Sequence, residues 1–123
     1  MKRFALIVSL VLCCCLSLNA QNDYYERQAN IFQNDAVYYL KQAQGYDRET
    51  DYYMSVATRY LRDGEKYQQQ KKYEQARNSL RKARNAIERA EDYKKRAENA
   101  RLKAQTNTRR AEEFLQKVEK SKD

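Results

Sequence analysis

A seven-residue repeat of small side chains runs through the C-terminal part of the sequence. It consists of Ala76, Ala83, Ala90, Ala97, Ala104, Ala111 and Val118. Interleaved on the same helical face are Tyr73, Leu80, Ile87, Lys94, Arg101, Thr108 and Leu115. Heptad spacing of this kind forms a packing seam along a helix, and no Gly or Pro interrupts it. The repeat predicts one long helix over residues 73–119 whose small residues face a neighbouring helix.

Two arrangements of the end of this helix are open. Thr106, Asn107 and Thr108 have side chains that compete for backbone hydrogen bonds, so the helix could break near 106–108. A fourth helix, about 109–120, could then fold back and bring Phe114 to Tyr93. Alternatively the helix is continuous and two chains associate through its tip. High helix propensity and the unbroken heptad favour the continuous helix.

Two further helices are expected before residue 70. Apolar residues recur at helical spacing from Tyr24 to Ala43, and Gly45 follows where a helix C-terminus favours a left-handed residue. Asp47 is a suitable N-cap for a second helix. We therefore expect helices at about 24–44 and 48–69. The chain as a whole, with Gly 2 and Pro 0, is predicted to be all-α: antiparallel helical hairpins or a three-helix bundle with a long Ala-heptad C-terminal helix.

A compact motif joins the second and third expected helices. Its packing residues are Tyr60, Gly64, Tyr67, Tyr73, Ala76, Leu80 and Ala83. The first three of these residues lie on one helical face and the last four on another, because residues three and four apart are neighbours on a helix. Since Gly within a helix costs about 1 kcal/mol relative to Ala, Gly64 should mark a close approach of the neighbouring helix. The motif predicts a helical hairpin.

This spacing resembles that of the tetratricopeptide repeat, a helix–turn–helix unit of about 34 residues, with residues 57–90 as a single degenerate repeat. Asp63 and Glu88 depart from the pattern of the family, which usually has Leu and Pro there. The resemblance implies that the first helix lines a groove for a partner segment. By position, the groove residues would be Thr58, Leu61, Glu65, Gln68 and Gln69. Leu61 and Glu65 differ from the side chains with which some members bind a C-terminal carboxylate.

The first twenty residues have the layout of a secretory signal peptide. Lys2 and Arg3 precede an apolar run, and Ala20 ends a stretch of the kind cleaved by signal peptidases. We expect a signal peptide at 1–20 and a single helical domain at 21–123, located in the periplasm or secreted. Cys13, Cys14 and Cys15 fit apolar filler of the signal better than a lipoprotein anchor, because Leu12 is not the small residue that such an anchor requires.

Charge is concentrated in the C-terminal half of the mature chain. Without Lys2 and Arg3, 23 basic residues stand against 17 acidic ones, a net charge of +6. Residues 74–123 supply all of this excess, and such asymmetry indicates an anionic partner or surface. The candidate anion-binding face comprises Arg77, Arg81, Lys82, Arg84, Lys94, Lys95, Arg96 and Arg101. Export makes nucleic acid an unsuitable partner and favours lipid head groups, acidic glycans or acidic protein segments.

The chain contains eleven tyrosines and no histidine. The tyrosines either complete a small core or form an aromatic groove for a peptide or glycan. In the doublets Tyr24–Tyr25, Tyr38–Tyr39 and Tyr52–Tyr53, one ring of each should be exposed. The mature chain has no Cys, no phosphate-binding Gly-rich loop and no nucleophile with a candidate base, so we expect neither catalysis nor a cofactor or metal.

The sequence thus favours a non-enzymatic protein-interaction module of the bacterial envelope, similar to a tetratricopeptide domain, with another protein or peptide segment as its partner. The alternative is a basic helical holdase, or a binder of anionic envelope polymers or lipid head groups.

Overall fold

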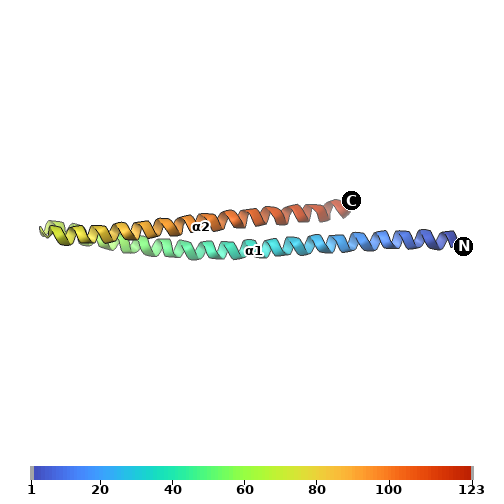
Figure 1. The fold of residues 1–123 in the computed structure, drawn as a ribbon, viewed down its shortest axis with the longest axis horizontal. Coiled ribbons are helices and arrows are strands. Elements are labelled where there is room, and N and C mark those ends of the chain that lie inside the picture. The colour runs from blue at the N-terminus through green and yellow to red at the C-terminus, as the bar shows by residue number, and fades with distance from the viewer. Residues whose placement is uncertain (1, 123) are drawn as a thin grey trace. The chain divides into compact units, whose positions relative to one another are not determined.

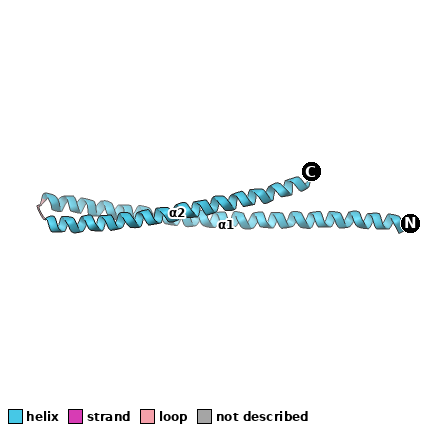
Figure 2. Cartoon of the chain, turned by 45° about the horizontal axis from the view of Figure 1, so that its top comes forward, coloured by secondary structure: helices cyan, strands magenta, loops and turns pink. Residues whose placement is uncertain are grey.

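The computed structural model describes the backbone of residues 2–122 and the side chains of Arg3 and residues 19–121. Two helices, α1 (Lys2–Gln69) and α2 (Tyr73–Lys122), pack antiparallel as a hairpin (Figure 1). The described backbone is helical apart from the short connection between them (Figure 2). The prediction of an all-α hairpin is therefore confirmed in its coarse form.

Helix α1 corrects the predicted three-helix bundle. It runs without interruption through Gly45, so the two helices expected at 24–44 and 48–69 are one. Gly45 has no left-handed backbone, and a single interior Gly weakens a helix without ending it. Asp47, the expected N-cap, lies within α1 and forms an ion pair with Arg101 of α2. Packing against α2 on both sides of Gly45 keeps α1 helical.

Helix α2 confirms the continuous form of the C-terminal helix. It passes through residues 106–108 without a break. The Thr108 hydroxyl donates to the Ala104 carbonyl oxygen at 2.9 Å, which satisfies the side chain within the helix. Phe114 packs against α1, where its ring is stacked on Phe32 at 5.7 Å between centroids. The contact with Tyr93 expected for a fold-back helix is thus replaced by an aromatic contact between the two helices.

The connection between the helices is a Schellman-type C-cap. The Lys71 amide donates to the Gln68 carbonyl at 3.0 Å, and the Lys72 amide donates to the Tyr67 carbonyl at 2.9 Å. This pattern requires a left-handed residue after the helix, and Lys71 supplies it with a φ of 59°. Gly is the usual residue at this position, so Lys71 is held there against its own steric preference.

Small residues at every seventh position form the seam of the hairpin. On α1 the buried members are Ala29, Ala36, Ala43, Ala57 and Gly64, and on α2 they are Ala76, Ala83, Ala90, Ala97, Ala104, Ala111 and Val118. No large side chain among the described residues is fully buried. The helices can approach closely because the seam residues are small, and the resulting core is thin.

The chain divides into two compact units, one of residues 1–37 with 104–123 and the other of residues 38–103. The first contains the stacked pair Phe32–Phe114. The second contains the turn and the contact at Gly64, where a Cβ would lie 3.2 Å from Leu80 Cδ2. The predicted close approach at Gly64 is confirmed.

Within the described residues, neither helix has an apolar stretch long enough to cross a membrane. The structure does not describe the side chains of residues 4–18. The apolar part of the expected signal peptide and the alternative of an anchor at Cys13–Cys15 fall on these side chains and remain predictions.

Candidate functional site

Aromatic side chains line one flank of the seam on α1. They recur every seven residues as Tyr25, Phe32, Tyr39, Tyr46, Tyr53, Tyr60 and Tyr67, and all are half-buried. Because a helix turns once every 3.6 residues, this spacing aligns them in one stripe. We call these seven residues the aromatic stripe.

Cations on α2 lie over aromatic rings on this flank of the seam. In the unit of residues 38–103 they are Lys82, Arg89, Arg96 and Lys103, which we call the cation row. Arg96 lies over Tyr93 of α2 itself, with its Cζ 5.3 Å from the ring centroid, and the other three lie over rings of the aromatic stripe. Lys82 Nζ lies 5.6 Å from the Tyr60 ring centroid, Arg89 Cζ 5.6 Å from that of Tyr53, and Lys103 Nζ 5.5 Å from that of Tyr39. These distances are within the range of cation–π attraction. Each member of the row directly precedes a buried Ala of the seam, which directs it toward the same flank.

The same pairing recurs within the other unit. Arg110 Cζ lies 5.7 Å from the Phe32 ring centroid, and Lys117 Nζ lies 5.5 Å from that of Tyr25. From Tyr60 to Tyr53, and again from Tyr39 to Phe32 and Tyr25, a step of seven residues along α1 is matched by a step of seven back along α2. The cation–ring pairs are therefore a repeated packing device that also leaves each charged end accessible to solvent.

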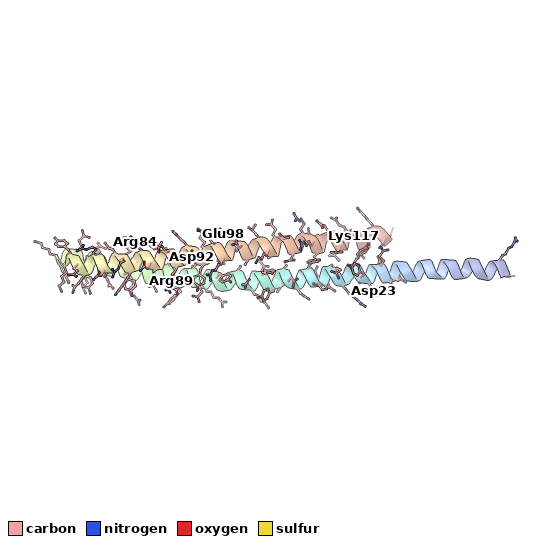
Figure 3. The ribbon with its side chains drawn as sticks, in the orientation of Figure 1. Asp23, Arg84, Arg89, Asp92, Glu98 and Lys117 are labelled. Carbon is pink, nitrogen blue, oxygen red and sulfur yellow. The ribbon has the colours of Figure 1, made fainter. Side chains whose placement is uncertain are left out.

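Arg89 is held by two interactions with the same tyrosine. Its Nη1 donates to the Tyr53 hydroxyl at 3.2 Å, in addition to lying over the ring. This hydrogen bond raises the pKa of the Arg89 guanidinium above its usual value, and charge interactions with Tyr53 and Tyr93 act in the same direction. Figure 3 shows Arg89 on the side of α2 next to α1 and Arg84 on the opposite side. Arg89 is thus a fixed positive charge on this flank.

Two shallow hollows open on either side of Arg89. The first, of about 260 Å³, is lined by Tyr53, Val56, Tyr60, Lys82, Asn85, Ala86 and Arg89. The second, of about 160 Å³, is lined by Tyr53, Arg89, Asp92, Tyr93 and Arg96. The Tyr53 ring belongs to both, and it stacks on Tyr93 at 5.7 Å with an angle of 10° between the planes. Each hollow therefore combines aromatic walls with two cations.

The tyrosine doublets extend the aromatic stripe outward. Tyr52 meets Tyr53 edge-on at 5.2 Å, and Tyr38 meets Tyr39 edge-on at 5.4 Å. Tyr38 and Tyr52 are each 60% exposed, and the second ring of each doublet is half-buried. The predicted division of each doublet into one packed and one exposed ring is confirmed, and Tyr24–Tyr25 follows it as well.

The opposite flank of the seam carries a different surface. Met54, Leu61, Tyr73 and Leu80 each precede a seam residue by three positions, which aligns them beside the seam, and we call them the apolar edge. They are between 45% and 61% exposed. Gly64 lies under Leu80, so the two helices are close at this point. The apolar edge is a solvent-accessible strip near the turn.

The structure places the predicted groove residues on the outside of α1. Thr58, Leu61, Glu65, Gln68 and Gln69 are all exposed, and the Thr58 hydroxyl donates to the Met54 carbonyl oxygen at 2.9 Å. Leu61 is the member that belongs to the apolar edge. Of the predicted repeat-packing residues, Gly64, Ala76 and Ala83 are buried and Tyr60 and Tyr67 half-buried. Tyr73 and Leu80 are exposed, because a seam of small residues leaves no space beneath them.

The predicted anion-binding residues are distributed around α2. All eight are exposed, but only Lys82 and Arg96 belong to the cation row. Arg101 lies on the other flank, where it pairs with Asp47. The remaining five are Arg77, Arg81, Arg84, Lys94 and Lys95. Composition identified the charged region but missed Arg89 and Lys103, which a search for cations at seven-residue spacing would have found.

No known protein family, curated protein or solved structure matches the chain. Both helices, of 68 and 50 residues, are longer than a whole tetratricopeptide unit of about 34 residues. Among the described residues no group of three or more acidic, His or Cys side chains is placed to hold a metal ion.

Proposed function

We propose that this protein is a non-enzymatic binding module of the bacterial envelope, exported after cleavage following Ala20, that binds a helical segment of another protein along the apolar edge. The main support for this proposal is that the core consists almost entirely of alanine, while large apolar side chains remain exposed at the surface. A third helix would bury the apolar edge, as one helix in the groove of a pair does in many complexes.

Local chemistry supports an amphipathic helix as the partner. Leu61 and Leu80 come from different helices and lie on the same flank, each 45% exposed, so together they form an apolar strip that spans the two helices. Thr58 and Glu65 border it on α1 and suit the polar rim of an interface. Burying two Leu side chains that are now about half exposed would contribute about 1 to 3 kcal/mol.

The test is capture of partners from envelope extract by the mature chain, residues 21–123, at low and high salt. Leu61→Arg places a charge on the apolar edge, and Ser55→Arg adds the same charge at an exposed position two residues before buried Ala57. We expect one or two partners that persist at high salt, are lost with Leu61→Arg and are retained with Ser55→Arg. Partners that salt releases and Leu61→Arg leaves unchanged would refute binding at the apolar edge.

A second copy of this chain is the competing partner for the apolar edge. The mass of the mature chain in solution distinguishes it, because a second copy would give a dimer that Leu61→Arg dissociates. That result would replace the partner helix by a second copy of this chain.

A second candidate function is binding of an anionic envelope polymer or lipid head group. The cation row favours it, since four cations at equal spacing on one flank sum to a positive strip. Binding of this kind weakens with ionic strength, whereas binding at the apolar edge does not. Salt titration therefore separates the two candidates.

A further inference from the structure

We propose that the two hollows beside Arg89 bind a linear acidic polysaccharide that carries one carboxylate or sulfate on every second sugar. This inference rests on the second candidate function, the binding of an anionic polymer, and names the ligand class and its site. All residues of the site lie in the unit of residues 38–103.

Aromatic walls are the first argument. A pyranose ring presents a face of C–H bonds that packs on an aromatic ring, and the hollows offer Tyr53, Tyr60 and Tyr93 as walls. Tyr53 is held in place by stacking on Tyr93 and by the hydrogen bond from Arg89. The amide of Asn85 in the first hollow and the carboxylate of Asp92 in the second are partners for sugar hydroxyl groups.

The spacing of charge is the second argument. Lys82, Arg89 and Arg96 follow one another at seven-residue intervals, which is about 10.5 Å along a helix. Two sugar rings of an extended polysaccharide cover a similar length, so an acid group on alternate sugars falls beside successive cations. Each strand of duplex DNA carries a phosphate about every 3.4 Å along the helix axis and would place unmatched charges between these cations.

The acidic side chain within the site is the third argument. Asp92 lies between Arg89 and Arg96 in the lining of the second hollow, and Figure 3 shows it on α2 beside Arg89. A carboxylate there repels a densely charged polyanion. It is compatible with a polymer that places a neutral sugar at that point, to which Asp92 accepts hydrogen bonds.

The test uses the mature chain with hyaluronan oligosaccharides, which carry one carboxylate per disaccharide. Tyrosine emission can be followed without interference because the chain has no Trp, and comparison with Tyr53→Phe identifies the part of the change that comes from the site. Calorimetry gives the affinity. Polyphosphate, neutral dextran and vesicles containing an anionic phospholipid are the comparison ligands. We expect saturable binding of hyaluronan with a change in tyrosine emission, weaker binding of polyphosphate and of vesicles, and no binding of dextran.

Arg89→Gln and Arg84→Gln are a matched pair of variants that remove the same charge from opposite sides of α2. Loss of a charge-assisted hydrogen bond predicts that Arg89→Gln weakens hyaluronan binding by about tenfold or more, whereas Arg84→Gln changes it less than about twofold. Lys82→Gln, which alters the first hollow, replaces Arg89→Gln if the latter loses helicity by circular dichroism.

Equal losses in the two variants would overturn the proposal, because binding would then follow net charge alone. Polyphosphate or vesicles could instead bind in preference to hyaluronan and still depend on Arg89. That result would overturn the assignment of a polysaccharide as the ligand and would leave the proposed binding of an anionic polymer or lipid head group intact. Binding of no anion at all would overturn both.

Discussion

Gly45→Ala is expected to stabilise the protein, and the reason lies in the continuity of α1. Gly45 is exposed within the helix, its φ is not positive, and a Cβ built on it meets nothing within 4 Å. Replacing an interior helical Gly by Ala at a site without steric conflict gains about 0.8 to 1 kcal/mol. For a domain of this size that gain corresponds to a rise of about 4 to 8 °C in the midpoint of thermal unfolding.

The assay is unfolding of the mature chain by heat and by urea, followed by circular dichroism. Gly64→Ala is the matched control, because its new Cβ would lie 3.2 Å from Leu80 Cδ2 and 3.3 Å from Leu80 Cγ. The half-exposed Leu80 must shift, so the gain should be smaller than at Gly45. A lower midpoint for Gly45→Ala would refute the reasoning, because it would mean that Gly45 adopts the left-handed conformation of a helix end.

Two further predictions concern the turn and the seam. Lys71→Gly should raise the free energy of unfolding by about 0.5 to 1 kcal/mol, since it relieves a left-handed lysine; the neighbouring Lys72→Gly should lower it, and urea titration measures both. Ala97→Leu inserts a large side chain where the exposed fraction is 0% and should cost about 1 to 3 kcal/mol. The exposed Asn99→Leu should change stability by less than about 0.5 kcal/mol, and equal effects at both positions would argue against the seam.

The sequence was sufficient to predict α2 because its signal is uniform. Every seventh residue from Ala76 onward is small, no residue breaks the helix, and the structure buries all seven members of the series. The close approach at Gly64 was also predictable, since a Gly that weakens a helix indicates a packing constraint. In α2 local propensity and tertiary packing favour the same structure, whereas at Gly64 the low helix propensity of Gly is itself the signal of close packing.

Helix α1 and the candidate site were harder to predict, for two physical reasons. Gly45 followed by Asp47 has the local signature of a helix end and a new start, and only packing against α2 overrides it. The aromatic stripe was present in the sequence at strict seven-residue spacing, but the adjacent exposed tyrosines obscured it. The cation–ring pairs depend on the register of two helices that are distant in sequence, which no local pattern specifies.

The repeat that builds the seam also makes its alignment ambiguous. Because small residues recur at each heptad on both helices, and the aromatic residues of α1 face cations of α2 at the same spacing, sliding one helix past the other by seven residues would restore much of the same packing. The features that do not repeat must therefore select a single alignment. They are the Lys71 turn, the fit of Leu80 over Gly64, and the bulky Tyr93 and Phe114 among small neighbours. A hairpin that first pairs one heptad out of register must therefore separate its helices again before it can reach the native alignment.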